Sequence, residues 1–140
     1  MPIDQTLVDA AKAQARARFP SGEGGVAAVY LCDGSILTSV GFDSPNEAAN
    51  LCYETGAYCE AYRQGKTVVA SVCVIREHEN APFVVVAPCG ICRERLAIWR
   101  ESVAVAVPVA DNPSQWRSVS FQDLQPWYWA AAFSSTSHTC

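Results

Sequence analysis

Residues 26–40 have the sequence VAAVYLCDGSILTSV, in which two apolar runs flank an Asp-Gly pair. The runs, Val26–Cys32 and Ser35–Val40, contain the β-branched and aromatic residues that favour strands. Asp33-Gly34 is typical of a tight β-turn, because glycine adopts positive φ without steric cost. The stretch therefore predicts an antiparallel β-hairpin, and the rest of the fold can be built outward from it.

Helical and strand patterns alternate on both sides of the hairpin. Before it, small and apolar residues at helical spacing predict a helix over Thr6–Phe19, capped by Asp4 and ended near Pro20. After it, we expect helices over Leu51–Gln64 and Cys89–Arg100, strands over Thr67–Ile75, Phe83–Ala87 and Val103–Val109, and a helical turn over Phe121–Leu124. Crossover helices imply parallel strand pairing, so the expected fold is an α/β three-layer sandwich with a mixed five-stranded sheet covered by helices.

The composition indicates one domain that spans residues 1–140. The chain is 50% hydrophobic and 17% charged, which suffices for a substantial core. Its net charge of −4 provides no broad basic field for a nucleic acid, so a free small molecule is the expected partner. No run approaches the roughly 20 apolar residues of a membrane helix, and the charged N-terminal segment is unlike a signal peptide, so we expect a cytoplasmic protein.

The chain contains seven cysteines, an odd number that favours metal ligands or buried thiols over disulfides. We expect Cys32 and Cys73, which lie in apolar strands, to be small buried hydrophobic residues. Cys59 is expected in the core. The polar end of the chain, Ser134–Cys140, is expected to be a flexible tail.

The remaining cysteines have the spacing of a zinc site. Cys89 and Cys92 are three positions apart at the start of a predicted helix, a spacing common in tetrahedral zinc sites. Cys52 lies near the start of another predicted helix, where the helix dipole favours a thiolate. Three protein ligands leave the fourth position of the zinc ion to water, as in catalytic sites. The sequence therefore predicts a catalytic Zn²⁺ held by these three cysteines.

Glu54 follows Cys52 by two positions and supplies a carboxylate beside the predicted zinc site. Zinc lowers the pKa of its water to about 7. In a hydrolytic deamination, a carboxylate then carries protons from the water to the substrate nitrogens. Three cysteine ligands, a glutamate that does not bind the metal and a Pro-Cys-x-x-Cys motif together are a known signature of zinc deaminases. We therefore predict that Glu54 is the general acid and base.

On these motifs the chain resembles the cytidine deaminase family, in the branch of short homo-oligomeric enzymes that includes blasticidin S deaminase. The family's Cys-Ala-Glu corresponds to Cys52-Tyr53-Glu54, and its Pro-Cys-Gly-x-Cys-Arg is intact at residues 88–93. The resemblance covers Pro20–Trp129. It implies a zinc-dependent deaminase of a nucleoside-like compound, a homotetramer, and a supporting role for Arg93 beside the zinc ligands.

The departures from the family pattern fall where the family binds its nucleoside. The sugar-binding Asn-x-Glu-Asn is replaced by Gly41-Phe42-Asp43-Ser44, and Gly24 replaces a phenylalanine that packs on the base. We expect the loss of that phenylalanine to open one wall of the substrate pocket. We also expect cytidine to be a poorer substrate than a cytosine nucleoside with an altered sugar or ring. The expected substrate contacts are Phe42, Asp43, Tyr53, Trp127 and Trp129.

Several roles stay open on the sequence alone. Asp43 either accepts a hydrogen bond from a sugar or only shapes the turn before Pro45. Trp127 and Trp129 either stack on a flat heterocycle or pack in the core or an interface. His78 is expected in solvent, although it could be a fourth ligand or a substrate contact, and His138 lies in the tail. The alternative functions are an interaction protein with structural zinc and a deaminase of another amino-heterocycle or of bases in nucleic acid.

Overall fold

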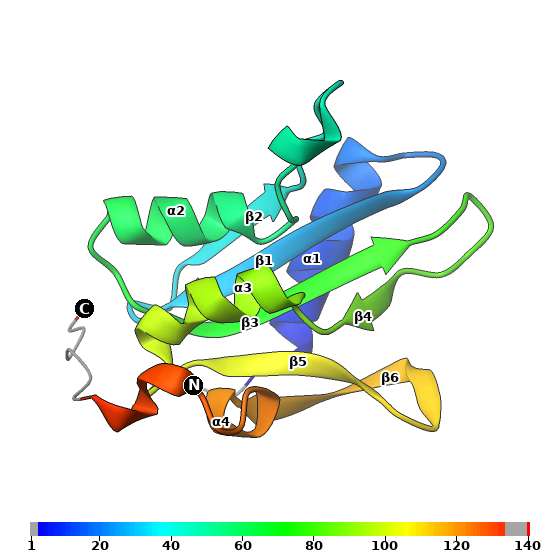
Figure 1. Cartoon of the computed structure of the whole chain (residues 1–140). Coiled ribbons are helices and arrows are strands. Elements are labelled where there is room, and N and C mark those ends of the chain that lie inside the picture. The colour runs from blue at the N-terminus through cyan, green and yellow to red at the C-terminus, as the bar shows by residue number, and fades with distance from the viewer. Residues whose placement is uncertain (1–2, 134–139) are drawn as a thin grey trace.

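Figure 1 shows a computed structural model of the chain, which describes residues 3–133 and Cys140. The helices are α1 (Gln5–Arg18), α2 (Thr55–Arg63), α3 (Gly90–Leu96) and α4 (Phe121–Leu124). The strands are β1 (Gly24–Leu31), β2 (Ile36–Val40), β3 (Val68–Arg76), β4 (Val84–Val86), β5 (Ala104–Val109) and β6 (Asn112–Ser120). Short 3₁₀ helices lie at Glu47–Ala49, Ala97–Trp99 and Trp129–Ala132.

The strands form a mixed six-stranded sheet with the order β2-β1-β3-β5-β6, in which β4 pairs with β3. The predicted hairpin is present as β1 and β2, and Gly34 has the positive φ of 83° that its turn requires. β1 is also antiparallel to β3, whereas β3 and β5 are parallel. The two strands that α3 joins, β4 and β5, run in opposite directions, which corrects the expected parallel crossover between them. β4 is antiparallel to β3, because a loop rather than a crossover helix connects these two strands.

The sixth strand, β6, corrects the expectation of five strands. It pairs antiparallel with β5 over registers from Ala104↔Ser120 to Val109↔Asn112. Its sequence, NPSQWRSVS, is mostly exposed and lacks an apolar run. β6 lies at an edge of the sheet, where polar residues and a proline are tolerated because one side of the strand has no partner.

Helices cover both faces of the sheet and give the expected three layers. α1 lies on one face, and α2 and α3 lie on the other (Figure 1). Leu7, Val8 and Ala11 of α1 pack in one core with inward residues of β1 and β3. The second core contains Tyr58 of α2 and Leu96 of α3. The sheet thus holds the N-terminal ends of α2 and α3 on the same side of the molecule.

The helix boundaries differ from the expected ones near the predicted site. α1 agrees closely, and the Asp4 side chain accepts a hydrogen bond from the Leu7 backbone, as a cap should. α2 begins only at Thr55, because Cys52 and Tyr53 lie in the turn that precedes the helix. α3 ends at Leu96 and continues as the 3₁₀ helix at residues 97–99. Cys52 and Glu54 therefore stand just before a helix rather than inside it.

Two expectations about cysteines are wrong. Cys32 forms a disulfide with Cys140, with Cα atoms 5.7 Å apart, instead of being a buried free thiol. This bond also fixes the last residue of the predicted tail, while residues 134–139 and His138 with them lie outside the described residues. Cys59 is exposed on α2, because the face assigned to it assumed a helix that already included Cys52. Cys73 is buried in β3 as expected.

Among the described residues, no helix has the length and apolar character needed to cross a membrane.

Candidate metal and catalytic centre

The three cysteines singled out in the sequence lie together in space. Their sulfur atoms are all within 4.8 Å of one another. Cys52 Sγ lies 3.3 Å from Cys89 Sγ. Cys52 belongs to the turn before α2, Cys89 precedes the first residue of α3, and Cys92 lies in the first turn of α3. The two helix starts thus bring together ligands that are 37 residues apart in sequence.

Local hydrogen bonds fix the two segments that carry these sulfurs. The Cys52 carbonyl accepts from the Thr55 backbone N–H at 3.1 Å, which closes the turn before α2. The Cys89 carbonyl accepts from the Arg93 backbone N–H at 2.9 Å, which is the first hydrogen bond of α3. Both cysteines therefore lie on ordered backbone at the N-terminal end of a helix, where the backbone N–H groups have no partner within the helix.

The expected lowering of thiol pKa at a helix start holds for one of the three cysteines. Burial acts to raise the pKa of Cys89, but backbone N–H groups of Cys92 and Ile91 and the Cys52 thiol lower it overall. Burial raises the pKa of Cys52, and burial together with the Glu54 carboxylate raises the pKa of Cys92. Of the three cysteines, Cys89 therefore has the lowered thiol pKa and the other two have raised ones.

The donor set fits a zinc ion. Zn–S bonds of about 2.3 Å in a tetrahedron place the sulfur atoms about 3.8 Å apart, which is compatible with three sulfurs that lie within 4.8 Å of one another. Among the described residues the cluster contains these three cysteines and no fourth ligand. His78, the open alternative for a fourth ligand, is exposed in the loop after β3. Three protein ligands are the pattern of a catalytic site rather than a closed structural one.

Glu54 lies directly against this cluster. Its side chain is only 4% exposed, and the Cys92 thiol donates to Glu54 Oε2 at 3.3 Å. Burial raises the pKa of Glu54 above the usual range of a glutamate, because water is largely excluded from the carboxylate. A buried carboxylate with a raised pKa, in contact with a cluster of three thiols, is a candidate for accepting and releasing protons.

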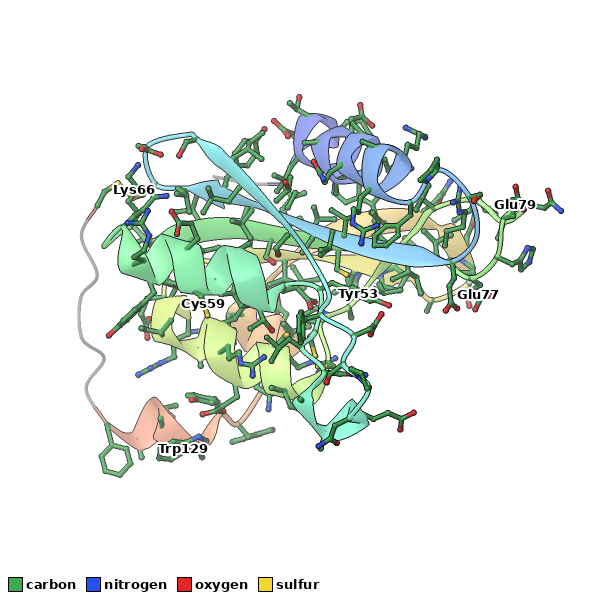
Figure 2. All side chains as sticks on the ribbon, turned by 90° about the horizontal axis from the view of Figure 1, so that it is seen from above. Tyr53, Cys59, Lys66, Glu77, Glu79 and Trp129 are labelled. Carbon is green, nitrogen blue, oxygen red and sulfur yellow. A yellow bond between two sulfur atoms is a disulfide. The ribbon has the colours of Figure 1, made fainter. Side chains whose placement is uncertain are left out.

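A cavity of about 480 Å³ lies next to Tyr53, the residue between Cys52 and Glu54. Its walls include Phe19, Asp43, Tyr53, Arg76 and Glu77. Asp43 and Tyr53 were expected at the substrate, whereas the other three carry no local sequence signal because they come from distant parts of the chain. Figure 2 labels two of these residues, Tyr53 near the start of α2 and Glu77 at the loop after β3.

The cavity wall beside Gly24 is not open, contrary to the expectation from the sequence. A Cβ atom at Gly24 would lie 2.5 Å from Cγ of Phe19, so the Phe19 ring already occupies that space. An aromatic ring from the end of α1 thus covers the position where the family pattern has its own aromatic side chain. Sequence comparison position by position cannot detect such a replacement.

The comparisons with known proteins agree with this geometry. No family model matches the sequence. The cytidine deaminase of Halalkalibacterium halodurans is 28% identical over 71 residues, and this match spans 51% of each chain, about half the length of that relative. The chain is also similar to the crystal structure of the cytidine deaminase from Bacillus anthracis. The two sequences are 39% identical, and the structural match has a TM-score of 0.83 and covers 91% of this chain and 90% of that chain.

The chain belongs to the cytidine deaminase family. A second similar crystal structure is that of the cytidine deaminase from Mycobacterium leprae, with 26% sequence identity and a TM-score of 0.67. This match covers 87% of this chain and 96% of that chain. The resemblance inferred from Cys52-Tyr53-Glu54 and from residues 88–93 is therefore confirmed at the level of the family.

In this member of the cytidine deaminase family, Arg93 hydrogen-bonds to the segment that precedes Cys89. Its Nε donates to the Pro88 carbonyl at 2.9 Å and its Nη1 donates to the Leu124 carbonyl at 3.1 Å. Pro88 precedes Cys89, so the guanidinium ties the segment that carries two ligands to α4. Arg95, which the sequence analysis did not single out, donates to the Thr55 hydroxyl at 2.8 Å, beside Glu54.

Three aromatic residues expected at the substrate, Phe42, Trp127 and Trp129, do not line the cavity beside Tyr53. Phe42 is 59% exposed and forms an isolated backbone bridge with Leu51. Trp127 is fully exposed, and Trp129 donates from Nε1 to Glu94 at 3.2 Å on the outer side of α3. Figure 2 shows Trp129 well away from Tyr53. A contact between either tryptophan and the substrate stays a prediction that would require a second subunit.

Proposed function

We propose that this protein catalyses the zinc-dependent hydrolytic deamination of the exocyclic amine of a cytosine-type nucleoside or nucleoside-like compound. The observation that carries the proposal is the contact of buried Glu54 with Cys92 inside a cluster of three cysteine sulfurs. Membership of the cytidine deaminase family supports the same reaction. The net charge of −4 favours a free nucleoside over a nucleic acid.

The chain's own residues account for the metal site and the proton transfers. Cys52, Cys89 and Cys92 would hold a Zn²⁺ ion, which supplies Lewis-acid activation of water when it is bound. The water oxygen bonds to the ring carbon, the carbon–nitrogen bond breaks, and ammonia leaves. Glu54 takes one proton from the water and delivers it to the ring nitrogen. It then takes the proton of the hydroxyl that has added to the ring carbon and delivers it to the leaving amine, so that ammonia departs and a carbonyl remains on the ring. Its burial keeps bulk water from exchanging these protons.

The finer parts of the proposal concern substrate preference, assembly and location. We propose a preference of the blasticidin S deaminase kind, for a cytosine nucleoside with an altered sugar or ring, because Gly41 has no side chain and Asp43 is short. We also propose a homotetramer in the cytoplasm. The disulfide between Cys32 and Cys140 is unusual for that compartment, so alkylation of the thiols in fresh lysate tests the location directly.

Replacing Glu54 tests the reaction itself. Glu54→Gln keeps the size of the side chain but cannot carry protons, so we expect zinc content near one ion per chain with kcat lowered by about 10²–10⁴-fold. The measurements are elemental analysis and ammonia release from cytidine, 2′-deoxycytidine, cytosine and nucleoside antibiotics. Glu60→Gln on α2 is the matched control and should keep the parent rate. Turnover by Glu54→Gln at the parent rate would contradict the assigned role.

The alternative functions predict different results in the same assays. An interaction protein with structural zinc would bind one zinc ion per chain but release no ammonia from any of these compounds. A deaminase of another amino-heterocycle would be inactive on all cytosine compounds and active on other ring amines.

A further inference from the structure

The Tyr53 side chain occupies space that glycine residues leave open. A Cβ atom at Gly25 would lie 2.6 Å from Cζ and 2.7 Å from Cε1 and Cε2 of the Tyr53 ring. A Cβ atom at Gly41 would lie 2.9 Å from Cδ1 of the same ring. The ring therefore rests on the backbone of β1 and on the residue that follows β2, and neither position can carry a larger residue while Tyr53 stays in place.

The Tyr53 ring is at the same time a wall of a cavity of about 480 Å³. It lines this cavity together with Asp43, Phe19 and Glu77, and it remains 39% exposed there. Its backbone carbonyl is fixed by the Ser39 hydroxyl, which donates to it at 2.6 Å. Its own hydroxyl makes no hydrogen bond with any described residue. The ring is thus held in place while its hydroxyl remains free for a ligand.

We propose that Tyr53 is a specificity-determining residue, whose ring supports the sugar-like part of the substrate and whose hydroxyl hydrogen-bonds to it. This inference rests on the proposed function. Tyr53 lines the cavity and is the chain neighbour of both Cys52 and Glu54. The proposal therefore places the reacting ring at Glu54 and the substituent over the Tyr53 ring, in the cavity. Gly25 and Gly41 act as positioning residues, because the absence of their side chains allows the ring to lie flat on the backbone.

The chemistry of the cavity indicates which substituents fit. Glu23, Asp43 and Glu77 line it with carboxylates. Arg76, the one cation among the described residues of its lining, already donates to the carbonyls of Gly22 and Phe19, both at 2.8 Å. Carboxylate oxygens accept hydrogen bonds, so the cavity suits a substituent with hydroxyl or amino donors and disfavours a phosphate.

Three variants separate the ring from the hydroxyl. Tyr53→Phe removes only the hydroxyl, Tyr53→Ala also removes the ring, and Gly25→Ala displaces the ring by steric contact. We measure kcat and KM for cytidine and 2′-deoxycytidine, and the dissociation constant of uridine, on zinc-loaded protein. Loss of one hydrogen bond to the substrate predicts that kcat/KM falls about tenfold in Tyr53→Phe, mainly through KM, and that uridine binds about tenfold more weakly.

The glycine contact gives a double-mutant cycle. Gly25→Ala should lower kcat/KM by at least tenfold in the parent, because the added methyl group pushes the ring into the cavity, yet it should have little further effect in Tyr53→Ala. Tyr62→Phe, which alters an exposed tyrosine on α2, is the matched control and should keep the parent constants.

Different results overturn different claims. If the parent is active and Tyr53→Phe keeps its KM and uridine affinity, or if Gly25→Ala is equally harmful with and without Tyr53, the inference about Tyr53 is wrong while the proposed function stands. If the zinc-loaded parent releases no ammonia from any nucleoside, the proposed function is wrong and the inference fails with it.

Discussion

Arg93 lies outside the sulfur cluster, and we predict that it orients the segment that carries Cys89 and Cys92. Its guanidinium spans from the Pro88 carbonyl, next to Cys89, to the Leu124 carbonyl at the end of α4. Groups that orient metal ligands typically change metal affinity by about 10–100-fold when they are removed. Arg93→Ala should therefore weaken zinc binding within that range while leaving the fold intact, as measured by competition with a chelator and by circular dichroism. The exposed Arg63→Ala on α2 should bind zinc normally, and equal zinc affinity in both variants would refute the role of Arg93.

At the scale of single residues, the sequence predicts the cysteine cluster and its glutamate but does not predict several of the residues that line the neighbouring cavity. Cys52, Glu54, Cys89 and Cys92 were found because their spacing within short motifs implies a shared site, and the structure does bring them together. Phe19 was not found, because its contact with Gly24 depends on how α1 packs against β1. Contacts of this kind join distant segments and leave no periodic pattern in the sequence.

The contact between α1 and β1 can be tested at the scale of elements. A methyl group added by Gly24→Ala would have to displace the Phe19 ring from the end of α1. Overpacking of this kind costs about 1–3 kcal/mol, so the free energy of unfolding should fall by that amount in urea titrations. In the Phe19→Ala background the same substitution should have almost no effect. An equal loss in both backgrounds would show that the two residues are not in contact.

The elements themselves differ in how well the sequence predicts them. The β1–β2 hairpin and α1 were placed within a residue or two, because Asp33-Gly34 and Asp4 mark a turn and a helix cap by local chemistry. β6 was missed, because an exposed edge strand needs neither apolar alternation nor an unbroken set of backbone donors. The start of α2 was placed too early, because the turn that carries Cys52 has no residue that separates it from the helix.

At the scale of the whole molecule, the described surface carries an aromatic patch that one chain leaves exposed. We define the C-terminal aromatic patch as Trp127, Trp129 and Phe133, which are 100%, 67% and 67% exposed. Exposed aromatic residues of this size commonly mark an interface. The family resemblance implies a tetramer, so we expect light scattering to give four times the chain mass of 15.1 kDa, and if the patch lies in its interface Trp127→Asp should lower that value. A stable monomer in the active preparation would contradict this prediction.

The Cys32–Cys140 bond closes the chain into a covalent loop that contains all three proposed zinc ligands. A protease that cuts one peptide bond inside this loop separates no fragments, because the two pieces remain joined through the sulfur atoms. Such a nicked molecule would migrate near the intact mass on a gel without reductant and would split into two bands only after reduction. The ligands contributed by the starts of α2 and α3 would stay tethered to each other even when the backbone between them had been cut.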